Sequence, residues 1–323
     1  MRHVVAGFAH RPGMHCASTA MADALRPAGL DLTEELALGL GAGLSFHYFR
    51  SPGLSPTRFF LGRSVSFEHD LCALVGVHFD ERSVSGFAAA WRQIRDWLDA
   101  DRPVLALTDV RWLPHYASNT HFNGHRIVIA GYDGGHALLA DSHFPGLVEV
   151  PLADLERAMT SDVAPVMTSD CIFGVLDPLE RPPLVPGLAR EAIRANAAEM
   201  LVTSETTGVS GIEALGASLP AWAEAPDAAW CARFAYQVIE KRGCGGGLFR
   251  RMYARFLDQA GLPALSRLAS DAADCWSRLA AELKGESEAA HPRFEKASAL
   301  TRQVALAERA LWERASDTQL TGG

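Results

Sequence analysis

The chain has 323 residues, a formal net charge of −8 and a hydrophobic fraction of 48%. This length and apolar content predict two domains with buried cores, and the lack of a basic cluster argues against nucleic acid as a partner. Charged residues and histidines interrupt the first fifteen positions, and no run of 18 apolar residues predicts a membrane span, so we expect a cytoplasmic protein without a signal peptide.

The first half of the chain predicts a mixture of helices and strands. Asp31 to Glu34 fit a capping box for the second helix, and the Asp133-Gly134-Gly135 turn predicts a hairpin. The expected elements, in chain order, are a strand at 3–9, helices at 17–26 and 32–38, a strand at 44–49, helices at 66–76 and 84–100, strands at 103–109, 125–133, 136–141 and 147–150, a helix at 151–160 and a strand at 170–176.

The second half predicts helices almost throughout. A segment with four prolines, 177–187, is the expected linker. The pattern predicts an α+β fold with a first domain over 1–178 and an all-helical domain over 188–318, whose apolar tail would suit a homodimer. The expected helices are at 188–203, 209–218, 226–241, 248–260, 264–284 and 293–316.

Three residues stand in the order that papain-like cysteine catalysts use. Cys16 lies at a predicted helix start, His125 opens an apolar strand, and Asp141 ends the next strand. A helix N-terminus and a nearby imidazolium both lower the pKa of a thiol from about 8.5. We therefore predict Cys16 as nucleophile, His125 as base and Asp141 as the group that orients the base.

Each of these assignments has an alternative in the sequence. Cys16 could be a buried structural cysteine. His121 and His136 compete with His125, and Asp133 competes with Asp141 although it lies where a tight turn favours aspartate.

An oxyanion hole would complete such a site. The backbone N–H of Cys16 is one expected donor. Papain-like enzymes carry a glutamine about six residues before the cysteine, and His10 stands there in this chain. His10 is therefore the expected second donor, while His15 could contact the substrate or tune the thiol.

Two further groups are predicted to bind substrate. Arg242, the glycines that follow it, Arg250 and Tyr253 could meet a phosphopantetheine phosphate or an acyl carboxylate; the alternative is a helix C-cap with a loop. His115, Tyr116 and His121 could line an acceptor pocket.

We expect no metal site. A set formed by His115, His121 and His125 lacks metal-binding spacing, and the six cysteines include no Cys-x-x-Cys pair.

Four segments resemble the butirosin-biosynthesis protein H family. Residues 13–48, 107–116 and 121–144 resemble its N-terminal domain, and 238–260 resemble the helical domain that commonly follows it. The resemblance extends over about residues 1–280. Each motif alone is weak, but the combination is fairly specific.

This resemblance implies a papain-like fold, akin to the C39 bacteriocin-processing peptidases, that acts as an acyltransferase. The member that names the family moves an aminoacyl group from an acyl carrier protein thioester to an amine of an aminoglycoside. Cys16, His125 and Asp141 match the family's Cys, His and Asp. The implied donor is a phosphopantetheine thioester of a carrier protein or of coenzyme A, and the implied acceptor is a small amine or hydroxyl.

Two other functions use the same residues differently. A hydrolase on this fold (a peptidase, amidase or thioesterase) would pass the acyl group to water. A non-catalytic binding protein would keep the fold without a reactive Cys16. The helical domain has no place in a minimal peptidase, and it therefore favours transfer.

Overall fold

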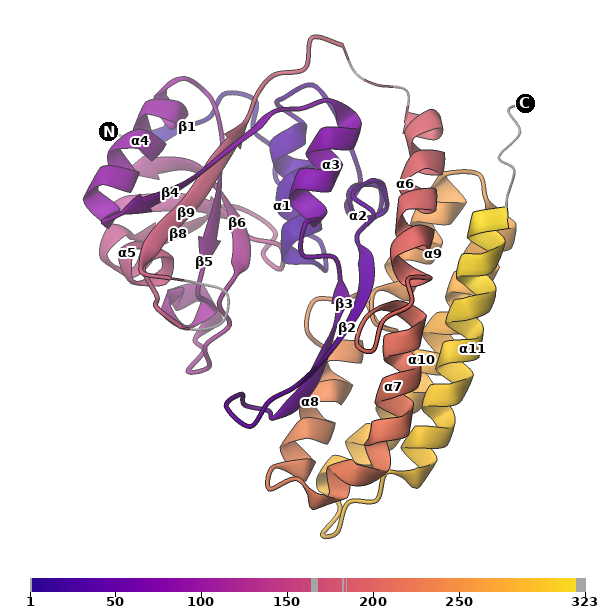
Figure 1. The fold of residues 1–323 in the computed structure, drawn as a ribbon. Coiled ribbons are helices and arrows are strands. Elements are labelled where there is room, and N and C mark those ends of the chain that lie inside the picture. Colours follow the sequence, from indigo (N-terminus) through magenta and orange to yellow (C-terminus); the bar gives the residue numbers. More distant parts are fainter. Residues whose placement is uncertain (1, 164–167, 182, 184, 318–323) are drawn as a thin grey trace. The chain divides into compact units, whose positions relative to one another are not determined.

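The chain divides into two compact units, each made of two stretches: 1–37 with 72–183, and 38–71 with 184–323. Figure 1 gives the order of the elements along the chain. The computed structural model describes residues 2–163, 168–181, 183 and 185–317.

An antiparallel sheet forms the centre of the first unit. Its strand order is β4-β9-β5-β6-β7-β8, and β1 pairs with β6. The strands are β1 (Arg2–Val4), β4 (Phe79–Ser85), β5 (Val104–Thr108), β6 (His125–Asp133), β7 (His136–Ala140), β8 (Val148–Pro151) and β9 (Asp170–Leu176).

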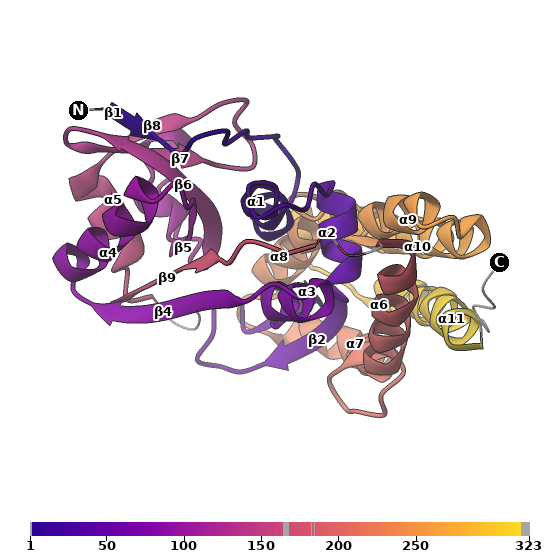
Figure 2. The same cartoon turned by 90° about the horizontal axis from the view of Figure 1, so that it is seen from above.

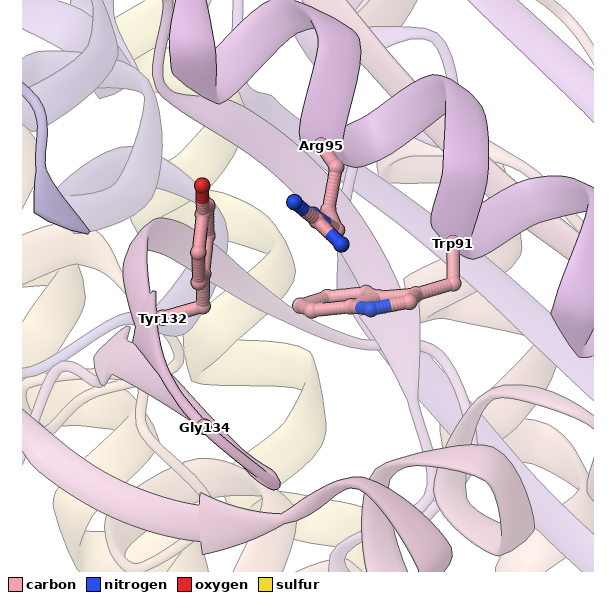
Figure 3. Close-up of a pocket in the computed structure, with 4 residues that line it drawn as sticks. All are labelled: Trp91, Arg95, Tyr132 and Gly134. Atoms are coloured by element: carbon pink, nitrogen blue, oxygen red, sulfur yellow. The ribbon is translucent and has the colours of Figure 1, made fainter. Parts of the chain in front are cut away.

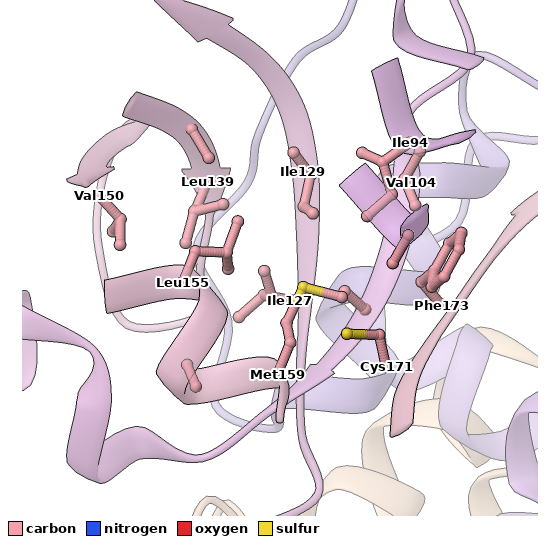
Figure 4. Packing of buried hydrophobic residues seen from close by; sticks show 14 of the residues in the cluster. Ile94, Val104, Ile127, Ile129, Leu139, Val150, Leu155, Met159, Cys171 and Phe173 are labelled. Carbon is pink, nitrogen blue, oxygen red and sulfur yellow. The ribbon is translucent and has the colours of Figure 1, made fainter. Parts of the chain in front are cut away.

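Apolar side chains on one face of this sheet build the core of the unit. Figures 1 and 2 show α4 (Phe87–Asp99) and α5 (Leu152–Met159) on this face and α1 (Cys16–Leu25) on the other. Ile127, Ile129 and Leu139 of the sheet pack with Ile94 of α4 and Leu155 of α5 (Figure 4). Alternation along β6 and β7 turns every second side chain to the other face, where α1 contacts β6.

Helices and one hairpin form the second unit. Strands β2 (Leu44–Arg50) and β3 (Arg58–Arg63) pair antiparallel, and the rings of Phe46 and Phe60 both lie 5.8 Å from that of Trp276. The helices are α6 (Val185–Met200), α7 (Gly208–Ser218), α8 (Ala228–Glu240), α9 (Arg250–Gln259), α10 (Pro263–Glu288) and α11 (Glu295–Asp317).

The α+β class is therefore confirmed, with an antiparallel sheet followed by helices. Two of the boundaries between the units fall inside helices: 37/38 lies in α2 (Glu34–Leu40) and 71/72 lies in α3 (Phe67–Val75). Among the described residues, no helix has both the length and the apolar character that crossing a membrane requires.

The observed units differ from the expected boundaries in one respect. Residues 38–71 group with the C-terminal helices, whereas the sequence placed them within a domain over 1–178. The hairpin buries Phe46 and Phe60 against Trp276, more than 200 positions later, and such a partner leaves no local signal. Of the expected linker and helical domain, positions 182, 184 and 318 lie outside the described residues.

Two strands were not expected from the sequence. β4 reads FDERSVS and contains no apolar run, yet it pairs with β9 along its whole length. The expected helix at 84–100 accordingly begins later, at Phe87. β3 (RFFLGR) was also missed, although it contains a short apolar run.

Candidate active site

Cys16 is the first residue of α1, as predicted, and its side chain is half-buried. His15 has extended backbone and caps the helix, because its Nδ1 accepts the backbone N–H of Ser18. The thiol thus lies where the unpaired N–H groups of a helix favour negative charge. His15 is buried, with 4% of the residue exposed, and the structure shows its side chain as the cap of α1.

Glu34 holds the segment before Cys16 in place. Its carboxylate accepts the backbone N–H of Met14 (2.8 Å) and of His15 (3.2 Å) and the hydroxyl of Thr19 (3.1 Å). Burial raises the pKa of Glu34, although these hydrogen bonds act against the rise. Gly13 is required here, since a Cβ would lie 2.1 Å from Oγ1 of Thr19.

Glu34 therefore does not close the capping box predicted for the second helix. Thr33 caps α2 instead, with Oγ1 accepting the N–H of Leu36. Asp31, the expected cap, pairs with Arg11 and Arg26. The carboxylate of Glu34 accepts the backbone N–H groups of Met14 and His15 rather than an N–H group of its own helix. The sequence pattern does not predict these long-range bonds.

His125 and Asp141 form a buried pair. Nε2 of His125 lies 3.0 Å from Oδ1 and 3.1 Å from Oδ2 of Asp141. The antiparallel register that pairs Val128 with Ala140 brings the start of β6 beside the residue that follows β7. The two side chains are 3% and 0% exposed, so the pair is shielded from solvent screening.

The environment of His125 favours a charged imidazole. Burial lowers its pKa, but hydrogen bonds to Asp141 and to the Cys16 thiol outweigh burial and raise the pKa to about 10. Since Nε2 faces Asp141, the other ring nitrogen is left for Cys16. An imidazolium beside a thiol at a helix N-terminus is the arrangement that stabilises a thiolate nucleophile.

Asp141 receives two further hydrogen bonds that the sequence did not predict. Nε2 of His115 lies 3.0 Å from Oδ2, and the hydroxyl of Tyr116 donates to Oδ1 at 2.8 Å. Burial raises the pKa of Asp141, but the bonds from His115, His125 and Tyr116 outweigh it and hold the pKa below its usual range. Burial and the Asp141 charge also raise the pKa of Tyr116. His115 and Tyr116, expected in an acceptor pocket, thus hold the carboxylate of Asp141.

A second buried carboxylate, Asp109, fixes the segment that carries His115 and Tyr116. It accepts His121 Nδ1–H (2.6 Å), the Ser161 hydroxyl (2.7 Å) and two backbone N–H groups. Burial raises the pKa of Asp109, but its hydrogen bonds, that to His121 first among them, lower it overall. Asp109 follows β5 as Asp141 follows β7, so the strand-end position was a signal that could have identified it.

The rival residues are thereby separated from Cys16. His121 is bound to Asp109, and His136 is exposed at the β6–β7 turn beside Asp133. Throughout the residues that the structure describes, no group of three His, Cys, Asp or Glu side chains is placed to hold a metal ion.

The prediction for His10 as oxyanion donor is wrong. Its Nδ1 lies 2.5 Å from Oδ2 of Asp23, and its Nε2 lies 2.8 Å from the carbonyl oxygen of Phe144. Burial lowers the pKa of His10, but these bonds raise it above the ordinary value. Both ring N–H groups are occupied, so neither can stabilise an oxyanion.

Arg250 and Tyr253 cannot bind substrate from the surface, because both side chains are fully buried. Nε of Arg250 lies 2.6 Å from Oε1 of Glu308, an ion pair inside the helical unit. Arg242 bonds to Gln237 and lies over the ring of Phe234. The prediction that Arg250 and Tyr253 bind a phosphate is therefore wrong. Both side chains belong to the buried core of the helical unit.

The structure has a cavity of about 280 Å³ at the far end of β6 from His125 (Figure 3). Trp91, Arg95, Tyr132 and Gly134 line it, and Arg95 points between the two aromatic rings. None of the predicted site residues lines this cavity.

Two family models match consecutive parts of the chain, and the first of them includes residues 38–71, which the structure groups with the C-terminal helices. Residues 15–142 match the family "Butirosin biosynthesis protein H, N-terminal", and residues 153–315, half of the chain, match "Domain of unknown function (DUF4872)". None of the curated proteins matches significantly. Among solved structures, a Bacillus anthracis protein described as a C39-like peptidase is similar, with 14% identity, a TM-score of 0.38, and coverage of 57% of this chain and 100% of that one. The chain belongs to the family in which the N-terminal domain of butirosin biosynthesis protein H is followed by a DUF4872 domain.

Proposed function

We propose that this protein is a cysteine-dependent acyltransferase. It takes an acyl group from a carrier-protein or coenzyme A thioester onto Cys16 and passes it to a small amine or hydroxyl. The observation that carries the proposal is the position of His125, hydrogen-bonded to the buried carboxylate of Asp141 and to the Cys16 thiol at the start of α1. The family's name, from butirosin biosynthesis, supports a role in the assembly of a small molecule.

The first step forms the acyl-enzyme. The Cys16 thiolate attacks the carbonyl carbon of the donor thioester, and the carbon–sulfur bond to the donor breaks. The imidazolium of His125 gives its proton to the departing thiolate and becomes neutral. Asp141 keeps the ring oriented throughout, because His115 and Tyr116 hold its carboxylate in place.

The second step releases the acyl group. The acceptor amine attacks the Cys16 thioester, the neutral His125 removes a proton from the nitrogen, and the thiolate of Cys16 leaves. This returns the imidazolium and thiolate of the resting enzyme. The order of events predicts ping-pong kinetics.

Intact-protein mass spectrometry with a panel of acyl thioesters tests the proposal. We expect an adduct of one acyl mass on the wild-type protein and none on Cys16→Ala. Cys275→Ala, which removes another half-buried cysteine, should keep the full adduct. Added amines should release the adduct faster than water does.

Two outcomes would overturn it. Release by water alone, at a rate that amines do not change, would identify a hydrolase. Absence of any adduct, together with slow alkylation of Cys16 by iodoacetamide at neutral pH, would indicate a binding protein without a reactive thiol.

A further inference from the structure

A second groove, of about 340 Å³, lies beside the segment that carries His115 and Tyr116. It is formed by two short 3₁₀ turns, η1 (Val110–Trp112) and η2 (Pro114–Tyr116), and by α5. Arg111 and Arg157 lie over the same ring, that of Trp112, at 5.3 and 4.9 Å from its centroid. The groove is thus an aromatic surface with two guanidinium groups against it.

The two guanidinium groups keep donors for a ligand. Arg157 bonds to Asp154, and Arg111 donates one N–H to the carbonyl oxygen of Asn119. Neither side chain has another hydrogen-bond or ion-pair partner among the described residues. Because a guanidinium has five N–H donors, each retains several, and the two arginines with Asp154 leave the lining with one excess positive charge.

The groove and the catalytic carboxylate share one segment of chain. Pro114 and Ala117 line the groove, and the residues between them, His115 and Tyr116, bond to Asp141. A ligand held in the groove is therefore bound within a few residues of the group that orients His125. The cavity in Figure 3 has no such connection, since it lies at the other end of β6.

We propose that this groove binds the phosphate of the donor's pantetheine arm, with Arg111 and Arg157 as its ligands. The inference rests on the proposed acyl transfer. Guanidinium groups bind phosphate oxygens in bidentate geometry, and stacking on Trp112 restricts both arginines before the ligand arrives. Pro114 and Ala117 offer apolar surface to the uncharged part of the arm. Coenzyme A and a carrier-borne arm have this phosphate in common.

The test compares thioesters that share the acyl-pantetheine group and differ in having no phosphate, the phosphate alone, or the phosphate with the nucleotide of coenzyme A. The acylation rate of Cys16 is measured by mass spectrometry with acyl-pantetheine, acyl-4′-phosphopantetheine and acyl-coenzyme A. We expect the phosphorylated donors to react about tenfold faster than acyl-pantetheine at low concentration, and Arg111→Gln or Arg157→Gln to remove about that factor. The rate with acyl-pantetheine should stay unchanged in both variants.

Arg95→Gln is the matched control, because Arg95 also lies over an aromatic ring but in the distant cavity. It should leave all three rates unchanged. In the wild-type protein, inorganic phosphate should slow acylation by acyl-phosphopantetheine and leave acyl-pantetheine unaffected, which tests the groove without any substitution. Acyl-coenzyme A could react faster than acyl-phosphopantetheine even in Arg111→Gln and Arg157→Gln. That result would show that the nucleotide of coenzyme A binds outside this groove.

Several results would overturn the inference while the proposed function stands. Cys16 would be acylated, but the phosphate would give no advantage, or the arginine variants would slow all donors equally. An effect confined to the affinity for the acceptor would instead assign the groove to an acidic acceptor. If no thioester acylates Cys16 at all, the proposed function itself is refuted.

Discussion

Nε2 of His125 lies 3.0 Å from Oδ1 of Asp141, with both side chains removed from solvent. Burial by itself lowers the pKa of an imidazole and raises that of a carboxyl. Here both shifts are reversed: hydrogen bonds to Asp141 and to the Cys16 thiol raise the pKa of His125 to about 10, and bonds from His115, His125 and Tyr116 lower the pKa of Asp141. The charges of the two groups therefore depend on this contact together with these neighbours.

Replacement of the carboxylate should change the pH range of activity. In Asp141→Asn the pKa of His125 should fall below about 10, since burial remains and the carboxylate charge is gone, while the Cys16 thiol still raises it. The imidazolium of the resting enzyme is then lost at a lower pH than in the wild type, where it persists to about pH 10. We expect transfer to slow by at least about a hundredfold at pH 8, measured as a pH–rate profile.

Asp133→Asn is the control for this variant, because Asp133 was the rival aspartate and lies at the exposed turn after β6. Its profile should match the wild type. If Asp141→Asn kept the wild-type upper pH limit of activity, the result would contradict the role assigned to Asp141.

Tyr116→Phe tests the second hydrogen bond to the carboxylate. The variant keeps the ring and removes only the hydroxyl, which donates to Oδ1 of Asp141 at 2.8 Å. A hydrogen bond to a charged group contributes about 1.5–3 kcal/mol, so acylation of Cys16 should slow about tenfold while the protein stays folded. Tyr132→Phe removes a hydroxyl bonded to Asp99 at the other end of β6 and should leave the rate unchanged. Equal rates in the two variants would show that Tyr116 only fills space.

Gly13→Ala tests the tight contact in the segment before Cys16. The added Cβ would lie 2.1 Å from Oγ1 of Thr19 and 2.5 Å from Oε2 of Glu34, so the 13–15 segment must shift. We expect the free energy of unfolding to fall by about 1–3 kcal/mol and alkylation of Cys16 by iodoacetamide to slow. Urea unfolding with parallel alkylation rates measures both.

Two comparisons make the Gly13 result specific. Gly146→Ala adds the same methyl group where no atom lies within 4 Å and should change neither quantity. Adding Thr19→Ala to Gly13→Ala removes the nearest atom and should restore part of the stability. No gain from the second substitution would mean that the strain arises elsewhere.

The sequence was sufficient to predict the positions of the site residues that lie at the ends of helices and strands. Cys16 follows a residue with extended backbone and begins a helix, and His125 and Asp141 are set by the ends of adjacent strands. Hairpin register brings such strand ends together, so their order along the chain already predicts the pairing.

Long-range hydrogen bonds were the part that local pattern could not supply. Glu34 has the spacing of a capping box, and nothing in the sequence says that its carboxylate meets Met14 and Thr19 instead. His10 occupies the expected oxyanion position, yet Asp23 and Phe144 take both of its nitrogens. Polar residues such as these have several sequence-compatible partners, and only the folded chain selects among them.

The buried pair of Arg250 and Glu308 leads to a prediction about stability alone. Glu308 also accepts the indole N–H groups of Trp276 (2.6 Å) and Trp312 (2.8 Å), so its charge is tied into the helical core. In Arg250→Met this carboxylate keeps the indoles but loses its only opposite charge among the described residues. We expect the free energy of unfolding to fall by about 3–5 kcal/mol, measured by urea unfolding.

The glycine-rich loop would give a different result if it bound a donor phosphate. In that case Arg242→Gln and Arg250→Met would both weaken the binding of the donor thioester. The structure instead predicts that acylation of Cys16 by acyl-phosphopantetheine keeps its wild-type rate in Arg250→Met wherever that variant is folded. Arg242→Gln loses a bond to Gln237 and the ring contact with Phe234, so stability should fall by no more than about 1 kcal/mol. A donor-specific rate loss in a folded Arg250→Met protein would contradict the structural role, because a side chain with no exposed surface has no direct route to the donor.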